Sequence, residues 1–424
     1  MLNEYMNILV ITDDFYPSKA GIAHTINTLC KYFQGREHKL YIVNPFYKAK
    51  NIYDILEHRK HSVLDFIKLF KNKRKIFTLL YSFLKIYRFK KIKLFYRINL
   101  ILYLLSKPKL LSQTITNVYN LIQAFKESKI DLVISAHSGK ILPLSFIVSR
   151  IFNTKIISMA HGLDFLINSY FSLKHFYFRS IDKFIVSSNW IKRLLIKIQK
   201  LDENRIFTIH RGLSLKDYDI KESKSQLRSQ LKISENEFVI LSVGRHISRK
   251  NFGLIIKAIR ELKNKDPMMN IKYYSIGMGP MTTELKNLTK NLELEDSVRF
   301  LGRCDAHLRN KFYKSSDLFI MPSITEKNNI EGFGIVFIEA NYYKVPVIGT
   351  YSGGIIEAIV NGKTGLLIRP NDLSDLVDKI SFLYKDKQTR NTYGENGYRR
   401  VIAEFNWETI IDEYIKAFQS TLGS

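Results

Sequence analysis

Short apolar runs alternate with amphipathic stretches of helical length along most of the chain. In the first half, runs rich in Val, Ile and Leu predict strands at 7–12, 39–43, 131–136, 155–160, 183–187 and 206–210. A second series begins with FVILSVG at Phe238 and continues through IKYYSIG, VRFLG, LFIMPS, VPVIGT and TGLLI. Apolar strands separated by helical segments are typical of parallel sheets with helical crossovers. The pattern therefore predicts doubly wound α/β domains.

The length and one polar stretch predict two such domains. A chain of 424 residues exceeds what one ordinary core holds. The polar sequence IKESKSQLRSQLKISENE separates the two strand series, so we predict an N-terminal domain at 1–218 and a C-terminal domain at 219–404. Apolar residues at helical spacing after Trp407 predict a terminal helix at 405–424, which we expect to pack back on the N-terminal domain.

Positive charge is concentrated in one part of the chain. The net charge is +27, and residues 66–126 contain fourteen Lys and Arg but no Asp or Glu. We expect the basic segment at about 53–111 to be a helical insertion in the N-terminal domain. Its aromatic and aliphatic residues are interrupted too often to span a bilayer, which favours docking on an anionic membrane surface. Ordinary helices with basic outer faces and binding of nucleic acid are the alternatives.

Cysteine usage and the N-terminus indicate an intracellular protein. Cys30 and Cys304 are the two cysteines of the chain and lie far apart, which indicates neither a disulfide framework nor a cysteine metal site. The N-terminal sequence MLNEYMNILVITDD has acidic residues and a short apolar run, so it predicts a first strand instead of a signal peptide. We expect a cytoplasmic protein.

Candidate ligand contacts follow predicted strands, where open α/β sheets bind their ligands. Gly21 lies at the start of the helix after the first strand, where a diphosphate could approach the backbone. His161, in MAHGLDF, could donate a hydrogen bond to a sugar hydroxyl or a phosphate. Arg245 and Lys250, in SVGRHISRKN, could straddle a diphosphate. Each residue taken alone also fits a structural or surface role.

Two carboxylates surround an apolar segment in IEGFGIVFIEA. Glu331 is predicted on the loop that leads into a helix, and Glu339 within that helix, at most about 12 Å further along its axis. Both could therefore contact one elongated ligand, such as a nucleotide diphosphate sugar. Alternatively, Glu339 pairs with a buried Arg or Lys in the core. Gly353 and Gly354, in GTYSGGIIEAI, form a further loop suited to phosphate.

Together these motifs resemble the retaining glycosyltransferases of family four, which have the GT-B fold. The resemblance rests on HGLD, HRGLS, SVGR with Lys250, SIGMGP, the two glutamates with seven residues between them, and GLLIRPND. It implies two Rossmann-like domains that face each other across a cleft, and no metal or other cofactor. The sequence is consistent with the absence of a metal, since no DxD pair follows a predicted strand.

The resemblance also implies roles for individual residues. His161, Glu331, Arg245 and Lys250 would be catalytic, with the two cations on the donor diphosphate and Glu331 on the sugar hydroxyls. Glu339 would hold the ribose, and Arg303 marks the turn whose backbone contacts the base. The remaining contacts near the phosphates would be Gly21, Gly332, Phe333 and Gly334.

These inferences predict a metal-independent hexosyltransferase that moves a sugar from a nucleotide-diphosphate donor to an acceptor hydroxyl with retention. We expect a UDP-sugar in preference to a GDP-sugar, and a lipid-linked or cell-surface glycan acceptor in bacterial polysaccharide or lipopolysaccharide synthesis. Peripheral association with the inner face of the plasma membrane would follow from the basic segment. A nucleotide-sugar 2-epimerase or a phosphorylase of the same architecture, and a non-enzymatic nucleic-acid-binding protein, are the rival interpretations.

Overall fold

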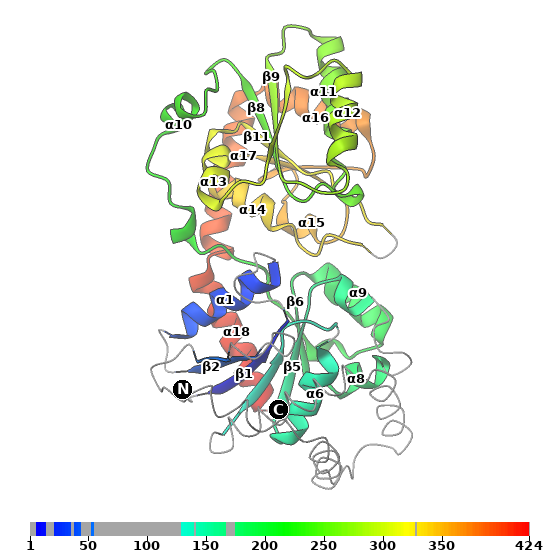
Figure 1. Cartoon of the computed structure of the whole chain (residues 1–424), viewed down its shortest axis with the longest axis vertical. Helices are drawn as coiled ribbons and strands as arrows, with labels where there is room; N and C mark the ends of the chain where they lie inside the picture. The colour runs from blue at the N-terminus through cyan, green and yellow to red at the C-terminus, as the bar shows by residue number, and fades with distance from the viewer. Residues whose placement is uncertain are drawn as a thin grey trace, which may run out of the picture. The chain divides into compact units, whose positions relative to one another are not determined.

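The computed structural model describes residues 6–13, 21–34, 38–43, 52–54, 129–139, 141–166, 174–326 and 329–423. The chain divides into two compact units. The first comprises Met1–Val186, Lys192–Thr208 and Glu413–Ser424, and the second comprises Ser187–Ile191 and Ile209–Asp412. Each unit contains one sheet with helices packed around it (Figure 1).

The sheet of the first unit has seven strands in the order β3-β2-β1-β4-β5-β6-β7. Their bounds are β1 Asn7–Ile11, β2 Lys39–Val43, β3 Ile52–Asp54, β4 Leu132–Ser135, β5 Lys155–Ala160, β6 Lys183–Val186 and β7 Ile206–Thr208. Neighbouring strands are parallel except β2 and β3. All four side chains of β4 are buried, as expected for a parallel strand covered on both faces, which accounts for its uninterrupted apolar sequence.

Helices of the first unit connect these strands. They are α1 Gly21–Gln34, α6 Leu142–Ile151, α7 Leu163–Leu166, α8 Lys174–Ser180 and α9 Asn189–Gln199, with the 3₁₀ helix η3 Glu203–Arg205. The first residues of α9, up to Ile191, belong to the second unit. The terminal helix α18, Trp407–Leu422, ends in this unit. Its Phe418 packs against Phe33 of α1, with the ring centroids 5.9 Å apart.

The sheet of the second unit has six strands in the order β10-β9-β8-β11-β12-β13, and every pair is parallel. The strands are β8 Phe238–Val243, β9 Ile271–Ile276, β10 Val298–Gly302, β11 Leu318–Ile320, β12 Val347–Thr350 and β13 Gly365–Ile368. Because β8 and β11 are neighbours, the loops after them open at the same edge of the sheet.

Helices and short 3₁₀ helices of the second unit connect its strands. The full set is η4 Leu215–Tyr218, α10 Lys224–Gln230, η5 Ser248–Lys250, α11 Phe252–Lys265, α12 Thr282–Asn291, α13 Ala306–Ser315, α14 Ile335–Tyr342, α15 Ile355–Ala358, α16 Leu373–Lys385 and α17 Lys387–Glu404. Side chains from both faces of the sheet form one continuous hydrophobic core.

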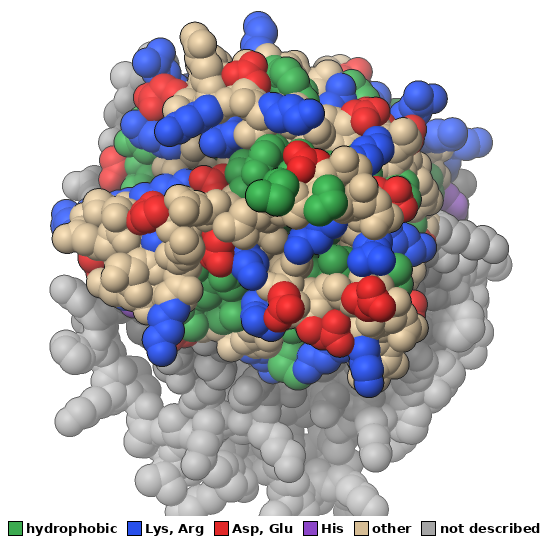
Figure 2. Space-filling view, turned by 90° about the horizontal axis from the view of Figure 1, so that it is seen from above, with side chains coloured by type: hydrophobic (Ala, Val, Ile, Leu, Met, Phe, Trp, Pro, Cys, Tyr) green, Lys and Arg blue, Asp and Glu red, His purple; other side chains and the backbone are tan. Residues whose placement is uncertain are grey.

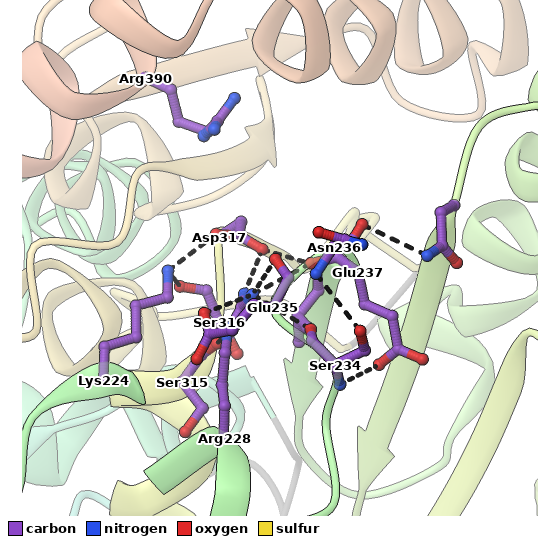
Figure 3. A network of polar contacts seen from close by, with 12 residues as sticks. Lys224, Arg228, Ser234, Glu235, Asn236, Glu237, Ser315, Ser316, Asp317 and Arg390 are labelled. Atoms are coloured by element: carbon purple, nitrogen blue, oxygen red, sulfur yellow. Dashed lines mark hydrogen bonds and ion pairs between the residues drawn. The ribbon is translucent and has the colours of Figure 1, made fainter. Parts of the chain in front are cut away.

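A buried polar network lies at the amino ends of β8 and β11 (Figure 3). Arg228 of α10 donates to Asp317 over 2.6 Å, and Lys224 donates to the same carboxylate over 2.7 Å. Asp317 also accepts from the backbone N–H of Val239 at 2.8 Å. Burial opposes ionisation of Asp317, but Lys224 and these hydrogen bonds outweigh it and lower its pKa. The network therefore holds α10 against the sheet.

The predicted doubly wound architecture is confirmed in both units. The predicted strand LFIMPS ends earlier, at Ile320, because Pro322 has no N–H to extend the ladder. Of the predicted helical insertion, residues 53 and 54 lie in β3 and not in a helix. The rest of the segment lies outside the described residues. Over the face shown in Figure 2, basic and acidic side chains are interspersed.

Candidate active site

Glu331 lies on the loop that leads from β11 into α14, as predicted. The loop ends at Gly334, whose φ of 90° is in the left-handed region that favours glycine. Helix α14 begins one residue later and carries Glu339, also as predicted. Phe333, which the sequence placed near the phosphates through its backbone, buries its side chain in the core at 2% exposure.

Two cations contact a single oxygen of Glu331. Lys250 Nζ lies 2.5 Å and Arg249 Nη1 lies 2.7 Å from Glu331 Oε2. The three side chains are between 10% and 16% exposed. Burial opposes ionisation of Glu331, but attraction to Lys250 and then Arg249 outweighs it and lowers the pKa to about 2. The site therefore holds an ionised carboxylate beside two positive charges.

Gly353 and Gly354, in the loop after β12, pack against the Glu331 loop. The N–H of Gly354 donates to the carbonyl of Glu331 over 2.9 Å. A Cβ on Gly353 would lie 2.4 Å from the Glu331 carbonyl oxygen, and one on Gly354 would lie 2.1 Å from that of Gly332. Both distances are too short for any side chain, so these glycines permit the close approach of the two loops.

Glu339 occupies a separate, buried cluster of hydroxyls. Its Oε1 accepts from Tyr218 and its Oε2 from Tyr313, both over 2.8 Å. Arg309 lies 3.9 Å from Oε1, and Glu339 is 6% exposed. Burial, and then the charge of Glu339, raises the pKa of Tyr218 and Tyr313. Arg309, the cation nearest to Glu339, is 28% exposed, so the close partners of this carboxylate are tyrosine hydroxyls and not a buried Arg or Lys.

The cation pair found here differs from the one singled out in the sequence. Arg245 is exposed, and its side chain makes no hydrogen bond or ion pair with the described residues. Arg249, which the sequence analysis did not select, contacts Glu331 instead. Its position next to Lys250 could have pointed to this role, but adjacent basic residues are common in this chain and do not single out one of them.

Of the remaining predicted contacts, His161 and Arg303 follow strands, and Gly21 begins a helix. His161 follows β5, and its Nε2 donates to the carbonyl of Ala136 over 3.0 Å; Asp164 accepts from its backbone N–H. Gly21 is the first residue of α1 in the same unit. Arg303 follows β10 in the second unit and is exposed.

No group of three or more His, Cys, Asp or Glu in the described part of the chain could hold a metal ion. Among the helices whose residues are described, none combines the length and the apolar character needed to cross a membrane.

Two doubly wound units, one of them with a charged site at strand ends, are an architecture found among glycosyltransferases, and family profiles match this chain. Residues 20–217 match the profile described as Glycosyltransferase Family 4, and residues 223–400 match Glycosyl transferases group 1. The two matches together span most of the chain. This chain belongs to the group 1 glycosyltransferases of family four.

Curated relatives are between 25% and 30% identical to this chain over the regions that match. N-acetyl-alpha-D-glucosaminyl L-malate synthase of Bacillus anthracis is 28% identical over 63% of this chain and 68% of its own length. The capsular polysaccharide biosynthesis glycosyltransferase CapM of Staphylococcus aureus is 28% identical over 56% of this chain and 61% of its own length. The matched region thus spans about three fifths to two thirds of these relatives.

Solved structures confirm the GT-B fold. A glycosyltransferase from Rickettsia africae ESF-5 superposes with a TM-score of 0.72 at 20% identity, covering 99% of both chains. Anabaena Alr3699/HepE in complex with UDP and glucose superposes with a TM-score of 0.68 at 18% identity, covering 98% of this chain and 100% of that one. At such identities the likeness concerns the fold.

Proposed function

We propose that this glycosyltransferase moves a sugar from a nucleotide-diphosphate donor to an acceptor hydroxyl, with retention and without a metal ion. The observation that carries the proposal is the ionised Glu331 beside Lys250 and Arg249 at the carboxyl ends of β8 and β11. A carboxylate suits sugar hydroxyls, and fixed cations suit a departing diphosphate. The second unit thus contains both the negative charge suited to the sugar and the positive charges suited to the diphosphate.

The proposed donor contacts follow from the resemblance, and the contact of Lys250 with Glu331 supports two of them. Lys250 and the exposed Arg245 neutralise the diphosphate, so no metal is required, while Glu331 accepts from the sugar hydroxyls. Glu339 takes the ribose, and the backbone after β10, at Arg303, takes the base. His161 acts beside the donor sugar from the first unit.

Solved structures with this fold support the choice of uracil as the donor base. Anabaena Alr3699/HepE is described in complex with UDP and glucose, and Staphylococcus aureus TarM in complex with UDP. We therefore favour a UDP-sugar. One relative, 30% identical, is named as GDP-mannose-dependent, so both nucleotides belong in the test.

The proposed acceptor is a lipid-linked or cell-surface glycan of bacterial polysaccharide or lipopolysaccharide synthesis. CapM, a relative named for capsular polysaccharide biosynthesis, supports this class. The basic segment would dock the enzyme on the anionic inner face of the plasma membrane. Sedimentation with vesicles tests the docking, and equal recovery with neutral and anionic lipid would contradict it.

Donor binding is the decisive experiment. Thermal shift and calorimetry with UDP, GDP and their sugars should show stabilisation by one nucleotide that persists in EDTA. The anomeric configuration of the product, followed by NMR, tests retention. Absence of binding to every nucleotide sugar would refute the proposal, and turnover of donor without acceptor would indicate an epimerase.

A further inference from the structure

Glu331 distributes its contacts unequally between its two oxygens. Lys250 and Arg249 both contact Oε2, whereas Oε1 has no hydrogen bond among the described residues. The backbone carbonyl of Glu331 is held separately by Gly354. The carboxylate is therefore fixed through one oxygen while the other is available to accept from a ligand hydroxyl.

Lys250 cannot serve two anions equally well. In the proposed function, it contacts the donor diphosphate, which draws its ammonium group away from Glu331. A buried carboxylate that loses its sole cation is strongly destabilised or takes up a proton. A protonated Glu331 would no longer be an ionised acceptor for the sugar hydroxyls, so a second cation is needed.

Arg249 is built to provide that second cation. Its backbone carbonyl accepts from the N–H of Ile324 over 2.8 Å, which fixes η5 against the segment after β11. Its side chain is 10% exposed, and its buried Nε has no partner among the described residues. A guanidinium stays charged at all relevant pH values and has five N–H donors. Arg249 can therefore keep its hydrogen bond to Glu331 Oε2 and still have N–H groups that donate to a ligand oxygen.

We propose that Arg249 is a positioning residue that keeps Glu331 ionised and oriented when the donor diphosphate engages Lys250. This inference rests on the proposed function, and it adds a residue outside the Arg245 and Lys250 pair implied by the resemblance. The charged groups recorded against Glu331 in the described part of the chain are Lys250 and Arg249.

Calorimetry of the full chain with inorganic diphosphate tests this without turnover. Titrations at pH 7 in buffers of different ionisation enthalpy report the protons taken up on binding. Diphosphate itself exchanges protons near neutral pH, so the wild type sets the baseline. Relative to the wild type, we expect additional uptake for Arg249→Gln because Glu331 protonates once Lys250 is drawn away, and no additional uptake for Arg249→Lys. Equal uptake in wild type and Arg249→Gln, or no diphosphate binding by the wild type, would overturn the proposal.

The pH dependence of transfer gives a second readout. The acid limb of kcat should move upward by at least about one pH unit in Arg249→Gln, a tenfold change in the proton affinity of Glu331, and Arg249→Lys should restore it. Arg228→Gln is the matched control, since Arg228 is also a buried arginine bound to a carboxylate, but at the amino ends of the strands. It should lower stability and leave the limb in place.

The two proposals fail in distinguishable ways. If the wild type transfers sugar and Arg249→Gln shows an unchanged acid limb with a kcat within about threefold of the wild type, less than 1 kcal/mol, then Arg249 has no positioning role. If the wild type binds diphosphate but transfers from no nucleotide sugar, the proposed function fails. The proton uptake then still decides the role of Arg249.

Discussion

Replacement of Glu331 by glutamine tests the charge arrangement of the site most directly. The side chain keeps its shape but loses its charge, so Lys250 and Arg249 are left buried without an acidic partner. A pKa of about 2 in place of the ordinary 4.5 corresponds to about 3 kcal/mol of stability from the ionised carboxylate at neutral pH. Removing one partner of a buried ion pair costs a similar amount, about 3–5 kcal/mol. We therefore expect Glu331→Gln to lower the free energy of unfolding by about 3 kcal/mol at pH 7.

Urea denaturation followed by tryptophan fluorescence measures this loss. Both tryptophans, Trp190 and Trp407, belong to the second unit, so their signal reports on the unit that contains the site. Because the folded pKa of Glu331 is lowered, its contribution is complete above pH 4.5 and is lost as the pH falls toward 2. The difference between wild type and variant should accordingly shrink below pH 4.5. Inorganic diphosphate should stabilise the variant more than the wild type, because it replaces the missing negative charge.

Glu395→Gln is the matched control for the same charge change. Glu395 lies 2.8 Å from Lys344, but the two side chains are 38% and 55% exposed. Water screens such a pair, so its loss should leave the unfolding transition within error of the wild type. A loss below about 1 kcal/mol for Glu331→Gln, the size expected of an exposed pair, would refute the reasoning.

Three further predictions concern the rest of the second unit. Asp317→Asn should destabilise it by about 3 kcal/mol, because it unpairs the buried network of Figure 3, whereas Asp219→Asn, at an exposed pair, should leave the urea midpoint unchanged. Gly354→Ala should abolish transfer while circular dichroism stays native, because its Cβ would displace the carbonyl of Gly332; near-normal rates would show that the loop tolerates the shift. Burial lowers the pKa of His246, so its stabilising contribution is complete above its unfolded pKa near 6.5 and is lost as the pH falls below it. His246→Gln should therefore flatten the decline of unfolding free energy between pH 7 and pH 5, and an unchanged slope would contradict this assignment.

The sequence by itself determined the fold class and the places where chemistry could occur. Apolar runs and helical periodicity are local properties, so they identified the parallel strands of both units and the loop and helix that carry Glu331 and Glu339. The sequence also marked Gly353 and Gly354 as a loop suited to phosphate, and the structure shows that they permit the close approach of two loops. The family resemblance, which rests on local sequence motifs, was confirmed by the family profiles.

Only the tertiary structure decided which charged groups meet. Glu331 contacts Arg249, 82 positions away in the sequence, because β8 and β11 are neighbours in the sheet and their loops open at one edge. Tyr218 reaches Glu339 across 121 positions for a similar reason. Pairing of this kind depends on strand order and on the burial of each side chain, and local periodicity contains neither. The sequence could therefore place Glu331 on a loop and Glu339 in the following helix, but it could not assign partners to either carboxylate.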